Sequence, residues 1–126
     1  DDTSGAEYYI DSRNGSTSYF WFLSEYNSYD YNFHDTSRFN DSNSYTNWHQ
    51  IVVTENAAGS AIYLNGVQKD TGSSSSGIGA NMRIGTRYTS SGFWNGQMAI
   101  VRVYNRDISK SEILYNFHAN RGRFGI

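Results

Sequence analysis

Cysteine and proline are both absent from this 126-residue chain. Without thiols, the chain has no disulfide scaffold, no cysteine-ligated zinc site and no cysteine nucleophile. Average usage of about 5% predicts roughly six prolines in a chain of this length, so their absence leaves every turn to glycine, asparagine, aspartate and serine. The turns should therefore be easy to find in the sequence.

Long apolar runs and a strong net charge are also missing. No stretch approaches the roughly 18 apolar residues of a membrane-spanning helix, and the N-terminus lacks the basic and apolar regions of a signal peptide. The formal net charge is −2, which gives no positive field to hold a phosphate backbone. We therefore expect a single domain over residues 1–126, with no membrane span and no nucleic-acid partner.

Aromatic residues are abundant instead: they make up 17% of the chain, and 11 of them are tyrosines. Large aromatic side chains suit the pleated, half-buried surface of a β-sheet. Asn14-Gly15 and Asn65-Gly66 supply the positive φ that tight hairpin turns require, and both pairs lie between strand-like runs. We predict strands at Glu7–Ile10, Tyr19–Leu23, Tyr29–His34, Trp48–Thr54, Ala61–Leu64, Val67–Lys69, Met82–Gly85 and Gln97–Tyr104.

Two other segments complete the predicted fold. The polar segment Asp35–Asn47 has no periodicity and is predicted to be an irregular connection. Ser109 and Glu112 have the spacing of a capping box, which predicts a helix that begins after Ser109 and ends near Asn120. The tail Arg121–Ile126 is expected to dock back on a sheet. Many short strands with one late helix predict an all-β, two-sheet antiparallel sandwich or jelly roll.

Five motifs follow one another in an order more specific than a generic sandwich requires. They are Asn47–Thr54, Ile62–Gly66, Arg83–Gly85, Phe93–Arg106 and Asp107–Ile113. In this order they resemble the laminin-G-like (concanavalin A-like) jelly-roll family, of the laminin G 3 type. The resemblance implies a fold found in adhesion, glycan-binding and structural proteins, including secreted bacterial proteins and bacteriophage virion proteins, and it implies no reaction.

The chain departs from this family at its beginning. Such domains usually open with further strands, whereas this chain enters the pattern near Tyr8. An uncovered sheet edge recruits another strand. We therefore expect either a smaller, repacked sandwich or strand complementation within an assembly.

Catalysis is not expected from the residues. Glycoside hydrolysis needs two carboxyl groups roughly 5 to 9.5 Å apart. Glu7 and Asp11 share a strand face by their spacing, but Asp11 abuts a turn and no closely alternating acidic trio is present. The nucleophile-elbow pattern G-x-S-x-G is absent, and His34, His49 and His118 lack metal-ligand spacing. We predict that the chain is not an enzyme.

Glycan or partner binding would use exposed tyrosines among polar side chains. Trp48, Tyr63, Trp94 and Tyr104 lie within the family motifs and are predicted to belong to the core. No cofactor is expected, with calcium as the alternative, because hard cations take carboxylate and carbonyl oxygens. The candidate calcium ligands are Asp35, Asn40 and Asp41, and the candidate ligand-binding residues are Tyr26, Tyr29, Tyr31, Tyr45, Arg87 and Tyr88.

These expectations describe a structural or adhesion module of a virion or other extracellular assembly. Its predicted partners are neighbouring structural subunits, identical copies or cell-surface glycan. The alternative is a lectin-like carbohydrate-binding module, with or without calcium.

Overall fold

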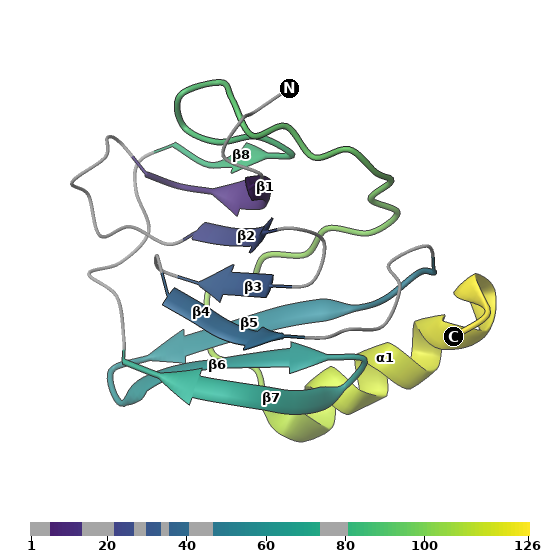
Figure 1. The fold of residues 1–126 in the computed structure, drawn as a ribbon. Coiled ribbons are helices and arrows are strands. Elements are labelled where there is room, and N and C mark those ends of the chain that lie inside the picture. Colours follow the sequence, from purple (N-terminus) through teal and green to yellow (C-terminus); the bar gives the residue numbers. More distant parts are fainter. Residues whose placement is uncertain (1–5, 14–21, 27–29, 34–35, 41–46, 74–80) are drawn as a thin grey trace. The chain divides into compact units, whose positions relative to one another are not determined.

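The computed structural model describes residues 6–13, 22–26, 30–33, 36–40, 47–73 and 81–126. This part of the chain contains eight strands and one helix (Figure 1). The chain divides into two compact units, which are described separately. The first unit comprises residues 1–43 and 75–99, and the second comprises residues 44–74 and 100–126.

The first unit is built on a five-stranded antiparallel sheet in the order β4-β3-β2-β1-β8 (Figure 1). The predicted pairing of the first two strands is confirmed, and the predicted strands around residues 30–33 and 83–84 are present. The turn predicted at Asn14-Gly15 lies outside the described residues. The strands are β1 (Ala6–Asp11), β2 (Phe22–Tyr26), β3 (Asp30–Phe33), β4 (Thr36–Asn40) and β8 (Arg83–Ile84).

Strand β1 carries a bulge that changes which of its residues share a face. Tyr8 lies opposite Ser24 and Ile10 lies opposite Leu23, so Tyr9 is an extra residue in the ladder. An extra residue reverses the alternation of side chains beyond it. Tyr8 and Asp11 therefore share one face of β1, and Glu7 lies on the other.

Two predictions about strands were wrong. The segment Asp35–Asn47 was expected to be irregular, but Thr36–Asn40 pairs with β3 as strand β4. Pairing with a neighbouring strand overrides a polar composition, because β propensity depends strongly on context. Conversely, Gln97–Tyr104 was expected to be a strand, and it forms no ladder with any described residue.

The second unit contains a three-stranded antiparallel meander of β5 (Ile51–Asn56), β6 (Gly59–Leu64) and β7 (Val67–Gly72). The turn between β6 and β7 is the predicted Asn65-Gly66 pair. Asn65 has φ 51° and Gly66 has φ 79°, the pair of positive values that a type I′ hairpin turn requires. The Asn65 side chain also accepts a hydrogen bond from the Gln50 N–H at 2.8 Å. The turn is therefore tied to the segment before β5.

Helix α1 (Lys110–Phe124) begins as its sequence predicts. The Ser109 hydroxyl accepts from the Glu112 N–H at 3.2 Å, and the Glu112 carboxylate accepts from the Ser109 N–H at 2.9 Å. Ile108 and Ile113 lie on either side of this capping box and pack with Tyr63 in one buried cluster. The cluster fixes the start of the helix against the meander.

The end of the helix differs from the prediction. It continues past Asn120 to Phe124 and stops at Gly125, whose φ of 71° forms a left-handed C-cap. Arg121–Phe124 are thus the last turn of α1 rather than a separate docked tail. Two basic residues in that turn suit the negative end of the helix dipole.

The fold class is confirmed at the level of its elements. The described residues form two antiparallel sheets with one C-terminal helix, as the all-β prediction requires. The face-to-face sandwich of a jelly roll stays a prediction.

We expect Gly66→Ala to lower the free energy of unfolding by about 1 to 2 kcal/mol, because alanine is strained at positive φ. Its Cβ would also lie 2.9 Å from Leu114 Cδ1. Gly122→Ala is the matched control, because a Cβ there meets nothing within 4 Å. It should raise the free energy of unfolding by about 0.5 to 1 kcal/mol, because alanine is favoured over glycine within a helix. Chemical denaturation measures both changes. Equal effects of the two substitutions would contradict the proposed role of the turn.

The capping box should make stability depend on pH. Hydrogen bonds from Arg106 and Ser109 lower the pKa of Glu112 to about 2. A pKa lowered by folding contributes stability that is complete above the ordinary value of 4.5 and is lost as the pH falls toward about 2. Between these limits the wild type should lose more stability than Glu112→Gln, as denaturation at several pH values would show. Parallel pH profiles would overturn this account of the helix start.

Candidate functional site

The structure places two of the six predicted ligand-binding residues in one described cluster. Arg87 and Tyr88 lie together in the segment between β8 and Trp94, in the first unit. Tyr29 and Tyr45 lie outside the described residues, while Tyr26 ends β2 and Tyr31 lies within β3. The cluster around Arg87 is therefore the candidate site that the structure can describe.

The site begins with an ion pair formed by two residues at the end of β1. Asp11 is fully buried and Arg13 is 3% exposed. The Arg13 guanidinium donates from Nη2 to Asp11 Oδ2 at 2.6 Å and from Nε to Oδ1 at 3.0 Å. The Arg13 backbone N–H donates to Oδ1 at 2.8 Å. This is the bidentate geometry in which arginine and carboxylate bind most strongly.

The electrostatics of Arg13 follow from this pairing. Burial works to lower the pKa of Arg13, but hydrogen bonds to Asp11 and Tyr8 outweigh it and raise the pKa above its ordinary value. Arg13 is therefore a permanent positive charge whose donors are directed at a carboxylate inside the molecule.

The same carboxylate holds the segment that carries Arg87. The Tyr88 N–H donates to Asp11 Oδ2 at 3.0 Å. Two backbone bonds attach the flanks of this segment to β1: the Gly85 N–H donates to the Tyr9 carbonyl at 3.0 Å, and the Tyr8 N–H donates to the Gly92 carbonyl at 3.1 Å. We call residues 86–92 the Arg87 loop. Three hydrogen bonds thus fix the loop and its base on β1.

The Arg87 loop has a tight internal structure. The Arg87 N–H donates to the Ser91 carbonyl at 2.9 Å, and the Ser90 N–H donates back to the Arg87 carbonyl at 3.0 Å. Ser90 has φ 57° and Gly92 has φ 57°. A Cβ on Gly92 would lie 2.8 Å from a ring carbon of Tyr8, so only glycine allows this close approach. The loop is therefore shaped to lie against Tyr8.

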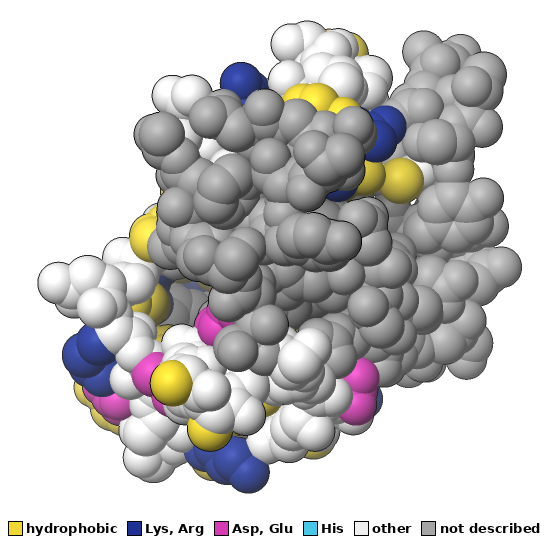
Figure 2. Space-filling model, turned by 90° about the vertical axis from the view of Figure 1, so that its left-hand side faces the viewer, with side chains coloured by type: hydrophobic (Ala, Val, Ile, Leu, Met, Phe, Trp, Pro, Cys, Tyr) yellow, Lys and Arg dark blue, Asp and Glu magenta, His cyan; other side chains and the backbone are white. Residues whose placement is uncertain are grey.

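Two arginines and two tyrosines lie close together where the Arg87 loop contacts β1. The Arg13 Cζ lies 5.0 Å from the ring centres of both Tyr8 and Tyr88. The Arg87 Cζ lies 5.8 Å from the Tyr8 ring centre and 5.3 Å from that of Tyr88. Each distance is within the range of a cation–π interaction. On the face drawn in Figure 2, basic side chains likewise lie directly beside hydrophobic ones at several places.

The two arginines differ in their hydrogen bonding. Arg13 is paired with Asp11, whereas no acceptor in the described part of the chain binds the Arg87 side chain. Its Nε is shielded from solvent and has no partner, and a buried donor without an acceptor is costly. A third arginine adds to the charge: Arg83 lies opposite Asp11 in the ladder and donates from Nη1 to the Arg13 carbonyl at 3.4 Å. The cluster thus contains three arginines and one carboxylate, and of the three guanidinium groups Arg13 is the one that binds the carboxylate.

Sequence reasoning identified Arg87 and Tyr88 but missed Tyr8, Asp11 and Arg13. The Asp-x-Arg spacing at the end of a predicted strand was a usable signal, because residues two apart can bond across a turn. No comparable signal in the sequence indicates the bulge at Tyr9, which is the feature that matters here. Without it, Tyr8 and Asp11 would lie on opposite faces of β1.

The bulge also corrects the relation between the two acidic residues considered for hydrolysis. Glu7 and Asp11 were expected to share a face of their strand, and they lie on opposite faces. Glu7 accepts from the Asn95 N–H at 3.0 Å, while Asp11 binds Arg13 and Tyr88. This strand therefore does not present the carboxyl pair of a glycosidase.

The predicted calcium ligands can be placed only in part. Asn40 is the last residue of β4, so the segment expected to be an ion-binding loop is partly a strand. Asp35 and Asp41 lie outside the described residues. Within the residues that the structure describes, no three acidic or histidine side chains group as metal ligands. Calcium binding stays a prediction.

The aromatic residues assigned to the core divide into two groups. Tyr63 is buried as predicted, and Trp94 is half-buried against Tyr9 with ring centres 4.3 Å apart. Trp48 and Tyr104 are exposed, contrary to the prediction. The ring centres of Trp48 and Phe124, the last residue of α1, lie 5.2 Å apart.

The two antiparallel sheets and the closing C-terminal helix of the described residues define a class of all-β domain. The model of the laminin G 3 family, described as the concanavalin A-like lectin/glucanase superfamily, matches residues 1–114. The chain therefore belongs to this family, as its motifs predicted.

Other comparisons are less informative. None of the curated proteins matches the chain. Among solved structures, the chain is similar to an S-layer domain-containing protein from Clostridium thermocellum, with 16% identity and a TM-score of 0.49. The likeness covers 92% of this chain and 64% of that one, so the chain spans less than two thirds of its length. Such a likeness carries no functional argument. In the described residues no helix has the length and hydropathy to cross a bilayer.

We expect Asp11→Asn to lower the free energy of unfolding by about 3 to 5 kcal/mol, because it leaves the buried Arg13 charge without its partner. The double variant Asp11→Leu/Arg13→Met, which removes both charges, should recover part of the loss, while the Arg13 and Tyr88 N–H groups that Asp11 accepts from remain without their acceptor. Urea denaturation of the three proteins measures this. An Asp11→Asn protein as stable as the wild type would mean that the ion pair does not hold the site.

Proposed function

We propose that the chain is a non-catalytic structural or adhesion module of a virion or other extracellular assembly. It acts by contact with neighbouring subunits, with copies of itself or with glycan. The observation that carries this proposal is an exposed apolar surface in the second unit, in the segment expected to be the last strand. The family description names both lectins and glucanases, so the proposal is argued from the surface.

The exposed surface is formed by residues that sheets normally bury. Ile100, Val101, Val103 and Tyr104 are all exposed, and Val103 is 56% exposed. The Asn116 side-chain amide donates to the Tyr104 hydroxyl at 3.5 Å, which connects this segment to α1. Exposed apolar groups of this density mark sites of association. We call residues 100–104 the apolar segment.

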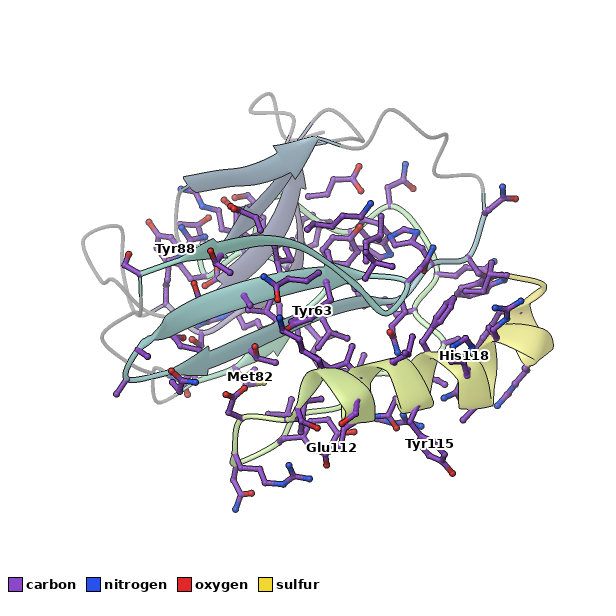
Figure 3. All side chains as sticks on the ribbon, turned by 90° about the horizontal axis from the view of Figure 1, so that it is seen from below. Tyr63, Met82, Tyr88, Glu112, Tyr115 and His118 are labelled. Atoms are coloured by element: carbon purple, nitrogen blue, oxygen red, sulfur yellow. The ribbon has the colours of Figure 1, made fainter. Side chains whose placement is uncertain are left out.

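Helix α1 also exposes large apolar side chains. Leu114 and Tyr115 are exposed, Tyr115 to 73%. Figure 3 shows Tyr115 pointing away from the helix, on the side opposite the strands. The exposed parts of these side chains are available to a partner.

The acidic side chains support a role without catalysis. Asp11 is bound to Arg13, and Glu112 is bound to Arg106 and Ser109. A glycosidase needs one carboxyl group as acid and another as base or nucleophile. Carboxylates whose oxygens are already occupied by such hydrogen bonds are poorly placed to bind a substrate in either role.

A lectin-like carbohydrate-binding module is the second candidate, and the Arg87 loop favours it. Its hydroxyl side chains and free guanidinium offer the donors and acceptors that a sugar needs. Calcium dependence belongs to this candidate and is tested with a chelator.

Association in solution tests the first candidate. We expect the mass of the wild-type chain, measured by light scattering, to rise with concentration. Val103→Asp should weaken this self-association by at least about tenfold, because it places a charge in an apolar contact. Val67→Asp is the matched control: Val67 is equally exposed but lies on β7, outside the apolar segment. A strict monomer that is also silent on an array of neutral and acidic glycans, with and without chelator, would overturn the proposed function.

A further inference from the structure

We propose that the Arg87 loop binds the carboxylate of a uronic-acid polysaccharide, with Arg87 as the anion-binding residue. This inference rests on the proposed contact function and names a ligand class for one of its surfaces. It is argued from the charge of the cluster, from the unpaired guanidinium and from the hydroxyl groups around it.

The charge of the cluster favours an anion. The Asp11 carboxylate is occupied by two nitrogens of Arg13, while Arg83 donates to the Arg13 carbonyl and Arg87 lies near the rings of Tyr8 and Tyr88. In the described residues, Glu7 is the nearest other acid on β1, and it lies on the opposite face of the strand. The cluster itself therefore holds three arginines and one carboxylate, although the whole chain has a net charge of −2. An anionic ligand complements it.

The Arg87 side chain is held ready for such a ligand. Its Nε is buried without an acceptor, and its Cζ is fixed near the rings of Tyr8 and Tyr88. The terminal nitrogens bind no acceptor in the described residues and are not shielded in the way that Nε is. A guanidinium positioned in advance loses little entropy on binding, and its planar fork matches the two oxygens of a carboxylate.

The surrounding side chains favour a sugar over an acidic peptide. Thr89 and Ser91 are joined by a hydrogen bond of 2.7 Å between their hydroxyl oxygens, and Thr89 is exposed. Each hydroxyl retains unused hydrogen-bonding capacity. The Tyr88 ring beside them is half-buried and so keeps part of its surface open. Hydroxyl groups and an aromatic surface next to one cation match a sugar ring that carries both hydroxyls and one carboxylate.

The test is a binding titration of the full chain with polygalacturonate, followed by calorimetry or tyrosine fluorescence. Fully methyl-esterified polygalacturonate is the matched ligand control, since it keeps the sugar backbone and loses the charge. Dextran sulfate and polyglutamate test the two other sources of negative charge. We expect binding to polygalacturonate, with the esterified polymer bound at least about tenfold more weakly.

The variants identify the residue. Arg87→Gln should weaken binding to polygalacturonate by about 10- to 100-fold, because it removes a charge-assisted, two-nitrogen contact. Arg87→Lys keeps the charge but loses the fork, so it should retain part of the affinity. Arg123→Gln removes an exposed arginine of the second unit, outside the apolar segment, and should bind as the wild type does. Circular dichroism of each variant checks that the fold is intact.

Several results would overturn the inference. Equal binding of the esterified polymer, preference for dextran sulfate or polyglutamate, unchanged affinity of a folded Arg87→Gln, and silence toward every polymer each contradict it. The concentration-dependent mass of the chain is measured in parallel. If self-association is present and polygalacturonate is not bound, the ligand assignment fails while the proposed contact function stands.

Discussion

The buried Asp11 carboxylate is the group on which the surface of the first unit depends. It accepts hydrogen bonds from the Arg13 side chain, the Arg13 backbone and the Tyr88 backbone. These donors come from the end of β1 and from a loop 77 residues further along the chain. A buried charge persists only where it is paired and hydrogen-bonded. The requirement to satisfy Asp11 therefore dictates where the Arg87 loop lies.

A consequence is that the two arginines of the cluster have different roles. Arg13 neutralises Asp11 and is enclosed, while Arg87 stacks near the same rings and keeps its charge unpaired in the described residues. The second unit shows a comparable division. Tyr63, Ile108 and Ile113 form its buried cluster, and the apolar segment and Tyr115 remain exposed. In each unit buried residues hold charged or apolar side chains at the surface, and the proposed contact function rests on these side chains.

Local signals in the sequence predicted local structure well. The capping box at Ser109 and the turn at Asn65-Gly66 were found because each depends on residues within three or four positions of one another. The family was found because several such motifs occur in a fixed order. Arg87 and Tyr88 were identified by residue type alone.

Features that depend on distant pairing were not predictable in this way. Strand β4 exists because β3 pairs with it, despite its polar composition. The bulge at Tyr9 depends on the register between β1 and β2, and a shift of one residue moves every later side chain to the other face. The apolar run Gln97–Tyr104 has the composition of a buried strand, yet it forms no ladder with the described residues. Composition shows that a segment is compatible with a strand, but the segment forms a strand only when another strand pairs with it.

The most direct test of this account is the hydrogen exchange of two neighbouring amides in the Arg87 loop, measured by NMR. The Tyr88 N–H is bonded to the buried Asp11 carboxylate, whereas the Thr89 N–H has no acceptor in the described structure. If Asp11 organises the loop, Tyr88 should exchange at least about a hundredfold more slowly than Thr89. Equal exchange of the two amides at the rate of an unstructured chain would contradict the central claim.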